Sequence, residues 1–327
     1  DSVTVTGWDQ SPLKYALDNN LRELRGRLGP ENEPFEFPMY YDLKEQGATD
    51  YLAVFERFSL TDDLRPGDDR RLPSGMIVTW AVDEPGGFTD QQVEEIRAII
   101  PALGIALKAN ANYEMAEDLL STYLGGDAGA RVLSGDIMRG SVDHIEAVIL
   151  YFDLQGFTKL SETLPGPDII AMLNDYFGVV VPAIQAHGGN VLKFMGDGLL
   201  AIFARTQVED ANLAAIETID DFKAQVPGVS ARRDAEGLPS TGFTVGIHAG
   251  EVLYGNIGSA DRLDFTVIGS AVNTTARISA MCSNLDQTVV ISGEVARPLL
   301  ERRPDLVSLG QYRLRGVADR KELFTLD

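Results

Sequence analysis

The chain has 327 residues, of which 44% are hydrophobic and 24% charged, so its composition is that of a globular protein and its length favours two domains. Its formal net charge of −21 argues against nucleic acid or an anionic membrane as a partner. No apolar run approaches the ~18 residues of a membrane span and no signal-peptide pattern is evident at the start. The single cysteine, Cys282, suits a reducing compartment, so we expect a cytoplasmic location.

The first third of the chain predicts a small mixed α/β domain. Leucines recur roughly on one face over residues 12–28, which predicts a helix there. Residues 51–58 and 75–82 are rich in β-branched and aromatic residues and predict two strands. Thr89 then provides a good N-cap for a further helix.

The helix after Thr89 is long and carries apolar residues in coiled-coil steps. The steps alternate between three and four residues, from Val93 through Ile96, Ile100, Leu103 and Leu107. The next position is the polar Asn110, the pattern resumes one residue early at Tyr113, and Pro101 should kink the helix. A stalk that joins two subunits and carries a signal fits this pattern. The alternative, a helix packed on the sheet of its own domain, is favoured for residues 90–108.

Residues 47–52, the strand ending at Val82 and residues 87–90 resemble a small GAF-type sensory domain over residues 1–110. The resemblance implies that this domain binds an unknown small-molecule or protein signal, or that it mediates dimerisation. Residues 111–143 would then form a helical connector.

From residue 144 to the end, strands and helices alternate. We expect a strand at 145–153, a helix at 168–186, a hairpin at 190–203, a helix at 208–223 and a pair of strands at 243–248 and 252–256. This order is βαββαβ, which predicts an extended ferredoxin-like, palm-like α+β domain over residues 144–327.

The hairpin carries a carboxylate at its tip. Two apolar runs flank Gly196, Asp197 and Gly198, and such a break predicts a tight turn. Asp153 ends the apolar strand 149–153. If that strand pairs with the hairpin, the two carboxylates converge and repel each other unless a cation lies between them, which favours Mg²⁺ and a phosphate substrate. The alternative is a surface hairpin whose aspartate merely suits the turn.

A second polar group lies on a predicted helix. Asn273 and Arg277 are four residues apart and share one helix face, from which Arg277 could bind a phosphate and Asn273 a ribose. The alternative for such a pair is an ordinary solvated face.

Together these motifs resemble the catalytic domain of class III nucleotidyl cyclases, over about residues 130–327. The motifs that carry the resemblance are 152–158, 193–197, 266–277 and the tail at 314–324. The resemblance implies a head-to-tail homodimer with two composite active sites, ATP as substrate and two Mg²⁺ (or Mn²⁺) in each site.

The resemblance also implies a role for each motif residue. One subunit would hold the metals through Asp153, Asp197 and the carbonyl of Leu154. Its backbone would face the triphosphate at Leu154, Gln155, Gly156, Phe157 and Thr158. The other subunit would supply Lys193 and Thr266 to the base, Asn273 and Arg277 to the ribose and phosphate, and Arg315 as a further phosphate contact.

Lys193 and Thr266 resemble the adenine-selecting combination of this family. An ammonium can donate to N1 of adenine, which is protonated in guanine, and the threonine hydroxyl can accept from the exocyclic amine. We therefore expect an adenylate cyclase that forms 3′,5′-cyclic AMP and pyrophosphate from ATP. The alternatives are a guanylate cyclase, another nucleotidyl transferase of the same fold such as a diguanylate cyclase, and an inactive dimeric nucleotide sensor.

Overall fold

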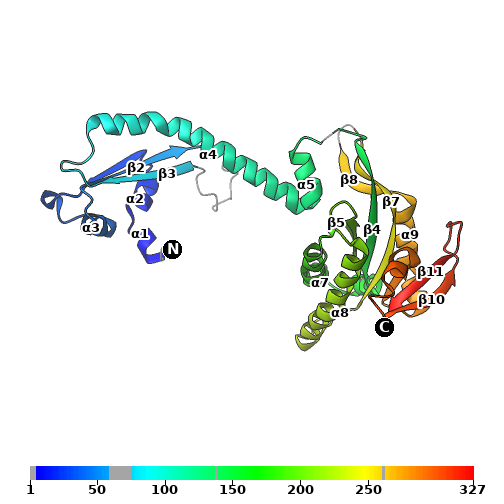
Figure 1. The fold of residues 1–327 in the computed structure, drawn as a ribbon. Coiled ribbons are helices and arrows are strands. Elements are labelled where there is room, and N and C mark those ends of the chain that lie inside the picture. The colour runs from blue at the N-terminus through cyan, green and yellow to red at the C-terminus, as the bar shows by residue number, and fades with distance from the viewer. Residues whose placement is uncertain (1–4, 59–74, 137, 260–261) are drawn as a thin grey trace. The chain divides into compact units, whose positions relative to one another are not determined.

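A computed structural model describes residues 5–58, 75–136, 138–259 and 262–327 (Figure 1). The chain divides into two compact units, Asp1–Met115 and Ala116–Asp327, and the boundary falls inside one long helix, α4. Each unit has its own sheet and its own hydrophobic core.

The first unit is built on a three-stranded antiparallel sheet in the order β1-β2-β3. Its elements are α1 (Val5–Asp9), α2 (Pro12–Asp18), β1 (Glu23–Arg27), a 3₁₀ turn (Pro30–Asn32), α3 (Pro38–Glu45), β2 (Asp50–Arg57), β3 (Gly75–Val82) and α4 (Asp90–Leu124). Side chains of the central strand β2 alternate between two cores: Tyr51 and Ala53 join the one with α2 and α3, whereas Leu52 and Val54 join the one with α4. Both strands predicted for this region are confirmed.

The predicted helix over residues 12–28 is wrong in its second half. Helix α2 ends at Asp18, Asn20 takes a left-handed backbone conformation with φ 57°, and Glu23–Arg27 form the edge strand β1. Strand β1 pairs with β2 in antiparallel register. The leucines are spaced as they are because their side chains pack into the core of the first unit. The hydrogen bonds that β2 offers to residues 23–27 outweigh the helix propensity of that segment.

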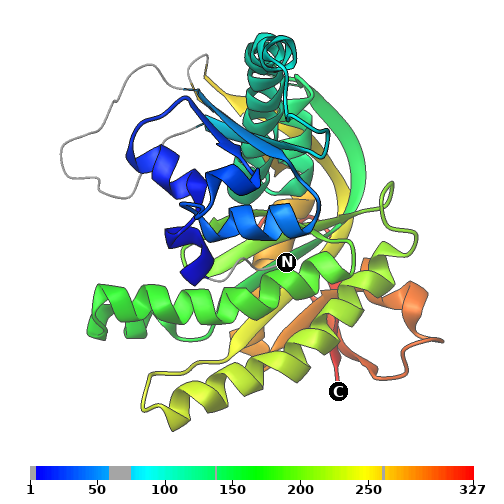
Figure 2. The ribbon, with the colours of Figure 1, turned by 90° about the vertical axis from the view of Figure 1, so that its left-hand side faces the viewer.

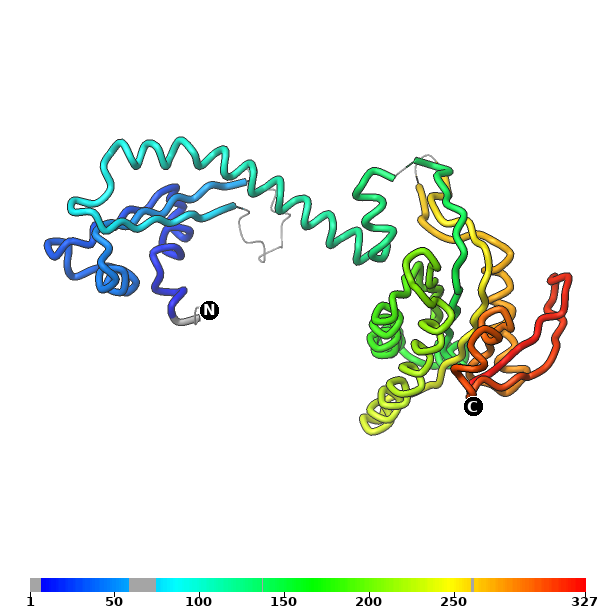
Figure 3. The backbone as a smooth tube through the Cα atoms, viewed as in Figure 1, coloured from blue at the N-terminus to red at the C-terminus, as the bar shows by residue number. Residues whose placement is uncertain are grey.

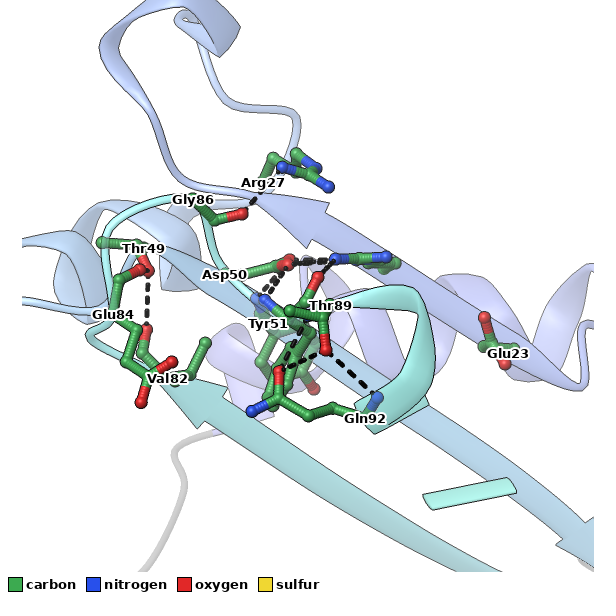
Figure 4. A network of polar contacts seen from close by, with 12 residues as sticks. Glu23, Arg27, Thr49, Asp50, Tyr51, Val82, Glu84, Gly86, Thr89 and Gln92 are labelled. Atoms are coloured by element: carbon green, nitrogen blue, oxygen red, sulfur yellow. Dashed lines mark hydrogen bonds and ion pairs between the residues drawn. The ribbon is translucent and has the colours of Figure 1, made fainter. Parts of the chain in front are cut away.

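A buried carboxylate fixes the start of α4 to this sheet (Figure 4). Asp50 is fully buried at the beginning of β2 and accepts hydrogen bonds from the Arg25 guanidinium at 2.6 Å and from the backbone N–H groups of Tyr51 and Phe88, both at 3.0 Å. Arg25 also donates to the Phe88 carbonyl. The loop before α4 is therefore held by charge-assisted hydrogen bonds that its own unit supplies.

Helix α4 begins with a capping box and continues unbroken past Pro101 (Figure 3). The Thr89 hydroxyl accepts from the Gln92 N–H, and the Gln92 side chain accepts from the Thr89 N–H, as the predicted cap requires. The residues that the helix buries are Val93, Ile100 and Gly104. Val93 and Ile100 pack on the sheet of the first unit, which confirms that alternative for the N-terminal half of the helix.

The second unit contains an eight-stranded sheet in the order β10-β11-β9-β7-β4-β6-β5, with β8 paired to β7. Its strands are β4 (Val142–Leu154), β5 (Asn190–Met195), β6 (Gly198–Ala204), β7 (Phe243–Gly258), β8 (Leu263–Ile268), β9 (Val289–Ser292), β10 (Leu306–Tyr312) and β11 (Lys321–Leu326). Its helices are α5 (Gly126–Leu133), α6 (Phe157–Thr163), α7 (Gly166–Ala186), α8 (Ala211–Ala235), α9 (Ser270–Ser279), α10 (Met281–Leu285), α11 (Gly293–Ala296) and a 3₁₀ turn (Arg297–Leu299).

The two faces of this sheet are covered by different elements. Helices α7 and α8 lie side by side on one face, where Val148, Leu150 and Phe152 of β4 join their core (Figure 2). On the other face, Ala147 and Ile149 of β4 pack with residues of α5, β8 and α9. Strand β4 is therefore buried on both faces, which explains why its sequence is a continuous apolar run.

Helix α7 is an exception to the expectation that the chain has no apolar segment of membrane-spanning length. By length and composition alone it could cross a membrane, and it is the one such helix in the described part of the chain. Its residues Met172, Tyr176, Val180 and Ile184 are fully buried in the core of the second unit. Core helices commonly have such a composition.

The strands predicted at 243–248 and 252–256 are one strand. Strand β7 runs unbroken from Phe243 to Gly258 and pairs with β4 along its length, from Leu154 opposite Phe243 to Val142 opposite Gly255. Residues 249–251, which separate the two predicted strands, pair with residues 146–148 of β4 and therefore stay extended.

Candidate active site

The structure confirms the hairpin and brings its carboxylate to Asp153. Strands β5 and β6 are joined by the two-residue turn Gly196–Asp197, in which Gly196 has φ 69°. The central strand β4 pairs with β6 so that Asp153 lies opposite Gly198, the residue after Asp197. Strand pairing therefore places the two aspartates beside each other.

The surroundings of Asp153 disfavour a negative charge on its carboxyl group. Burial, together with the charge of Asp197, raises the pKa of Asp153 to about 6. Both side chains are half-buried, and no cationic side chain of the described residues pairs with either. A divalent cation between them would remove the repulsion.

The donor set fits Mg²⁺ or Mn²⁺. Among the described residues, no third His, Cys, Asp or Glu joins Asp153 and Asp197, so the remaining ligands would be a carbonyl oxygen such as that of Leu154, water and phosphate oxygens. Gly198, which has no side chain, leaves room beside the Asp153 carboxylate. A Cβ at this position would lie 2.7 Å from the Phe152 carbonyl oxygen and 2.9 Å from Oδ1 of Asp153, closer than van der Waals contact allows.

The backbone after Asp153 contributes fewer free amides than the sequence predicts. The Gln155 N–H donates to the Gly242 carbonyl at 3.0 Å, so the fold itself uses it. Gly156, with φ 67°, precedes α6, whose first residues are Phe157 and Thr158. The N–H groups of Gly156, Phe157 and Thr158 have no backbone acceptor in the described part of the chain, as expected at a helix start.

Asn273 and Arg277 share a face of α9, and both line a cleft of about 650 Å³. Arg277 forms no ion pair or hydrogen bond with any residue that the structure describes. Gly316 closes the cleft beside it, since a Cβ at Gly316 would lie 3.4 Å from the Arg277 guanidinium. The neighbouring Arg315 is exposed and does not line this cleft.

Two further residues line the same cleft, His248 and Lys321, and the sequence predicted neither. His248 is buried on β7, its Nδ1 lies 2.8 Å from the Ser292 hydroxyl, and burial lowers its pKa to about 4, so its imidazole is neutral at neutral pH. Lys321 forms an ion pair with Glu294. A lone histidine and a distant lysine carry no spacing signal, and only strand pairing brings them together.

Lys193 lies on β5 and Thr266 on β8, two strands that come into contact although they do not pair. The Lys193 ammonium is 3.6 Å from the Asp264 carboxylate, and Asp264 is two residues before Thr266, on the same side of β8. The Thr266 hydroxyl is buried and has no hydrogen-bond partner among the described residues. Because buried hydroxyls are nearly always bonded, this one indicates a missing partner.

Within one chain these residues form separate groups. Asp153 lines a cleft of about 350 Å³ together with Leu154, Gln155 and Gly156. Asn273 and Arg277 line the larger cleft, whereas Lys193 and Thr266 line neither.

Comparisons with known proteins converge on one family. Residues 141–327 match the family model described as the adenylate and guanylate cyclase catalytic domain. A protein named adenylate cyclase from Anabaena cylindrica is 33% identical over 163 residues, which are 49% of this chain and 32% of that protein. An uncharacterized protein of Mycobacterium tuberculosis is 29% identical over 208 residues, 62% of this chain and 37% of that protein. The matched region thus spans about a third of the length of these relatives.

Solved structures show the same fold. A bacterial light-regulated adenylyl cyclase is 24% identical with a TM-score of 0.56, and the match covers 70% of this chain and 65% of that one. An adenylyl cyclase from P. aeruginosa is 22% identical with a TM-score of 0.51, and the match covers 57% of this chain and 96% of that one.

Proposed function

Because the chain belongs to the adenylate and guanylate cyclase family, we propose that it is an adenylate cyclase that converts ATP to 3′,5′-cyclic AMP and pyrophosphate. The observation that carries the proposal is the division of the site. In the described part of one chain, no cationic side chain pairs with Asp153 or Asp197, and Arg277 lies unpaired in a different cleft. Two copies arranged head to tail would bring the carboxylates of one to Arg277 of the other, which makes two composite sites in a homodimer.

The carboxylate side of each site would hold the metal ions. Asp153, Asp197 and the carbonyl of Leu154 are the ligands that the chain offers. When bound, two Mg²⁺ or Mn²⁺ lower the pKa of the ribose 3′-hydroxyl and neutralise charge on the phosphates. The free N–H groups at the start of α6 supply further donors to the triphosphate.

The partner's side of each site would orient the nucleotide. In the reaction the ribose 3′-hydroxyl loses its proton to water and its oxygen forms a bond to the α-phosphorus. The bond from the α-phosphorus to the bridging oxygen breaks, so that pyrophosphate leaves with the electron pair. Arg277 is free to donate to the phosphate as this charge develops, and Asn273, one turn away, can hold the ribose.

Lys193 and Thr266 would select adenine. The orphaned Thr266 hydroxyl gains a partner when it accepts from the exocyclic amine of adenine. Lys193 must leave Asp264 to reach N1, and an ion pair with 38% and 66% exposed side chains costs little to break. A guanine base would offer a protonated nitrogen to Lys193 instead.

The test is product identification. The protein is incubated with ATP or GTP and with Mg²⁺ or Mn²⁺, and the product is identified by mass. We expect cyclic AMP from ATP. Formation of cyclic GMP from GTP, with no cyclic AMP from ATP, would assign a guanylate cyclase. No cyclic nucleotide from dimeric protein would favour the inactive nucleotide sensor. A Lys193→Glu variant should weaken the use of ATP, and unchanged ATP kinetics would remove Lys193 from base selection.

The composite site has its own test. Asp153→Ala and Arg277→Ala should each abolish activity, whereas a mixture should recover part of it because one of the two sites in a mixed dimer is intact. A mixture that stays inactive although subunits exchange would show that each site lies within one chain.

We also propose that the first unit is a GAF-like regulatory domain that responds to a small molecule or protein, and that the protein acts in the cytoplasm. A three-stranded sheet with helices on both faces supports a compact sensory unit.

A further inference from the structure

Asp264 lies on β8, two residues before Thr266 and beside the residues that we propose to select adenine. Strand β8 pairs with β7 in uninterrupted antiparallel register, with Asp264 opposite Ile257 and Thr266 opposite Gly255. Asp264 and Thr266 therefore project from the same face of the strand, roughly 7 Å apart along it. On its other edge β8 pairs with no strand that the structure describes, which leaves that edge open.

Lys193 reaches Asp264 from β5, a strand that contacts β8 without pairing with it. The pairing of β5 with β6 shifts register between Val191 and Lys193, as at a β-bulge. Bulges redirect side chains and are frequent beside active sites. The Lys193 ammonium lies 3.6 Å from the Asp264 carboxylate, which is 66% exposed and has no other ionic partner among the described residues. A group that only donates and a group that only accepts are thus held side by side.

The three side chains differ in what they can offer to a base. An ammonium only donates hydrogen bonds, an ionised carboxylate only accepts them, and a hydroxyl does both. The Thr266 hydroxyl is buried and has no partner in the described part of the chain, so it can accept from the amine of adenine. It can equally donate to the carbonyl oxygen that guanine carries at the same ring position, and so can Lys193. Asp264 is the only one of the three that rejects this oxygen.

We propose that Asp264 is a specificity-determining residue that accepts a hydrogen bond from the exocyclic amine of adenine. The inference rests on the proposed function, because it assumes that Lys193 and Thr266 bind the base. When Lys193 turns to N1, Asp264 loses its ionic partner. The amine is bonded to the ring carbon next to N1, so it comes to the same place and supplies a donor in exchange.

The amine has enough hydrogens for both residues of β8. Its two N–H bonds diverge by about 120°, so two acceptors at ordinary hydrogen-bond length would lie about 5 Å apart. Side chains of Asp264 and Thr266, two residues apart on one face of the strand, can span that separation. One hydrogen would go to the carboxylate and the other to the hydroxyl.

Guanine would meet Asp264 with the wrong group. Its carbonyl oxygen stands where adenine carries the amine, and a carboxylate has no hydrogen to give to it. A site that is built to bind an amine discriminates strongly against an analogue without one, because the acceptor is left without a donor. Asp264 therefore supplies the selectivity that Lys193 and Thr266 do not.

Asp264→Asn tests this role, since an amide has nearly the same shape as a carboxylate but can donate as well as accept. Values of kcat/KM are measured for ATP and for GTP. We expect the preference for ATP over GTP to fall at least tenfold. The loss with ATP should lie mainly in KM, because the base is remote from the reacting phosphorus.

The matched control is Glu146→Gln, which neutralises another exposed carboxylate of the same sheet, 3.7 Å from Arg205. It should leave the ATP preference unchanged. An unchanged preference in Asp264→Asn, or an equal change in Glu146→Gln, would overturn the proposal.

Exchanging the two charges separates base selection from a purely structural ion pair. Lys193→Glu combined with Asp264→Lys keeps the pair but puts an acceptor at ring position 1 and a donor at the exocyclic position, which is the complement of guanine. We expect this double variant to prefer GTP. A return to the original preference for ATP would show that the pair only supports the fold, and would overturn the proposal. If the double variant is inactive, the Asp264→Asn ratio decides.

The two proposals fail in different measurements. If the unchanged protein forms only cyclic GMP, the proposed function is wrong before any variant is made. If it forms cyclic AMP and Asp264→Asn keeps the full preference for ATP, only the role of Asp264 is wrong.

Discussion

Asp50 and Asp153 both stand on the central strand of a sheet, one in each unit, and their surroundings are opposite. Asp50 is completely buried, and its own unit gives it a guanidinium and two backbone N–H groups. Asp153 is half-buried, and its nearest charged neighbour is a second carboxylate. A carboxylate that receives its hydrogen bonds from the fold itself contributes to stability, whereas one without such donors is available to bind a ligand.

The largest expected difference concerns activity. Asp153→Asn should reduce cyclase activity by roughly 1,000-fold or more, because an amide neither balances a divalent cation nor completes its ligand set. Initial rates with ATP and Mg²⁺ measure the loss, and circular dichroism confirms the fold. Activity within tenfold of the unchanged protein would remove Asp153 from the site.

Asp50→Ala should instead destabilise the first unit by about 3 kcal/mol or more, since it leaves Arg25 and two N–H groups without their acceptor. The two tryptophans of the chain, Trp8 and Trp80, both lie in the first unit, so tryptophan fluorescence in urea follows that unit. Glu23→Ala, which removes the exposed partner of Arg97, is the control and should cost less than about 1 kcal/mol. Similar losses for both variants would contradict a special role for Asp50.

A methyl group at position 198 should disturb both the pairing of β6 with β4 and the Asp153 carboxylate. We expect Gly198→Ala to destabilise the second unit by about 2 kcal/mol and to weaken metal binding, because the added carbon meets the Phe152 carbonyl and Asp153. Gly178→Ala in α7 is the control, since open space surrounds that position and alanine favours a helix by up to about 1 kcal/mol. Calorimetry measures both effects, and a harmless Gly198→Ala would show that the turn adapts.

The smallest effect depends on pH. Because the pKa of Asp153 is raised to about 6 in the folded protein, the folded state binds more protons than the unfolded state between about pH 4 and 6. The free energy of unfolding without metal should therefore fall as pH rises through this window, by roughly 1 kcal/mol after allowance for solvent screening. Asp153→Asn should remove this slope in urea titrations at pH 5 and 7.5. Metal affinity should fall below pH 6, and a pH-independent affinity would contradict the raised pKa of Asp153.

Much of the catalytic unit could be predicted from local pattern. The alternation of strands and helices, the turn at Gly196–Asp197 and the shared face of Asn273 and Arg277 all follow from short-range spacing. The helix expected at residues 12–28 and the break expected in β7 were wrong for one reason: a neighbouring strand supplied hydrogen-bond partners that no local window contains.

By itself, the sequence determined which residues carry the chemistry, since carboxylate, amide, hydroxyl and guanidinium groups act through their own donors and acceptors. Tertiary structure alone decided their surroundings. Strand register placed Asp153 against Asp197, left the Thr266 hydroxyl without a partner among the residues that the structure describes, and kept Arg277 in a separate cleft. It also decided which stripe of α4 faces its own sheet, because burial depends on neighbours that are distant in the chain.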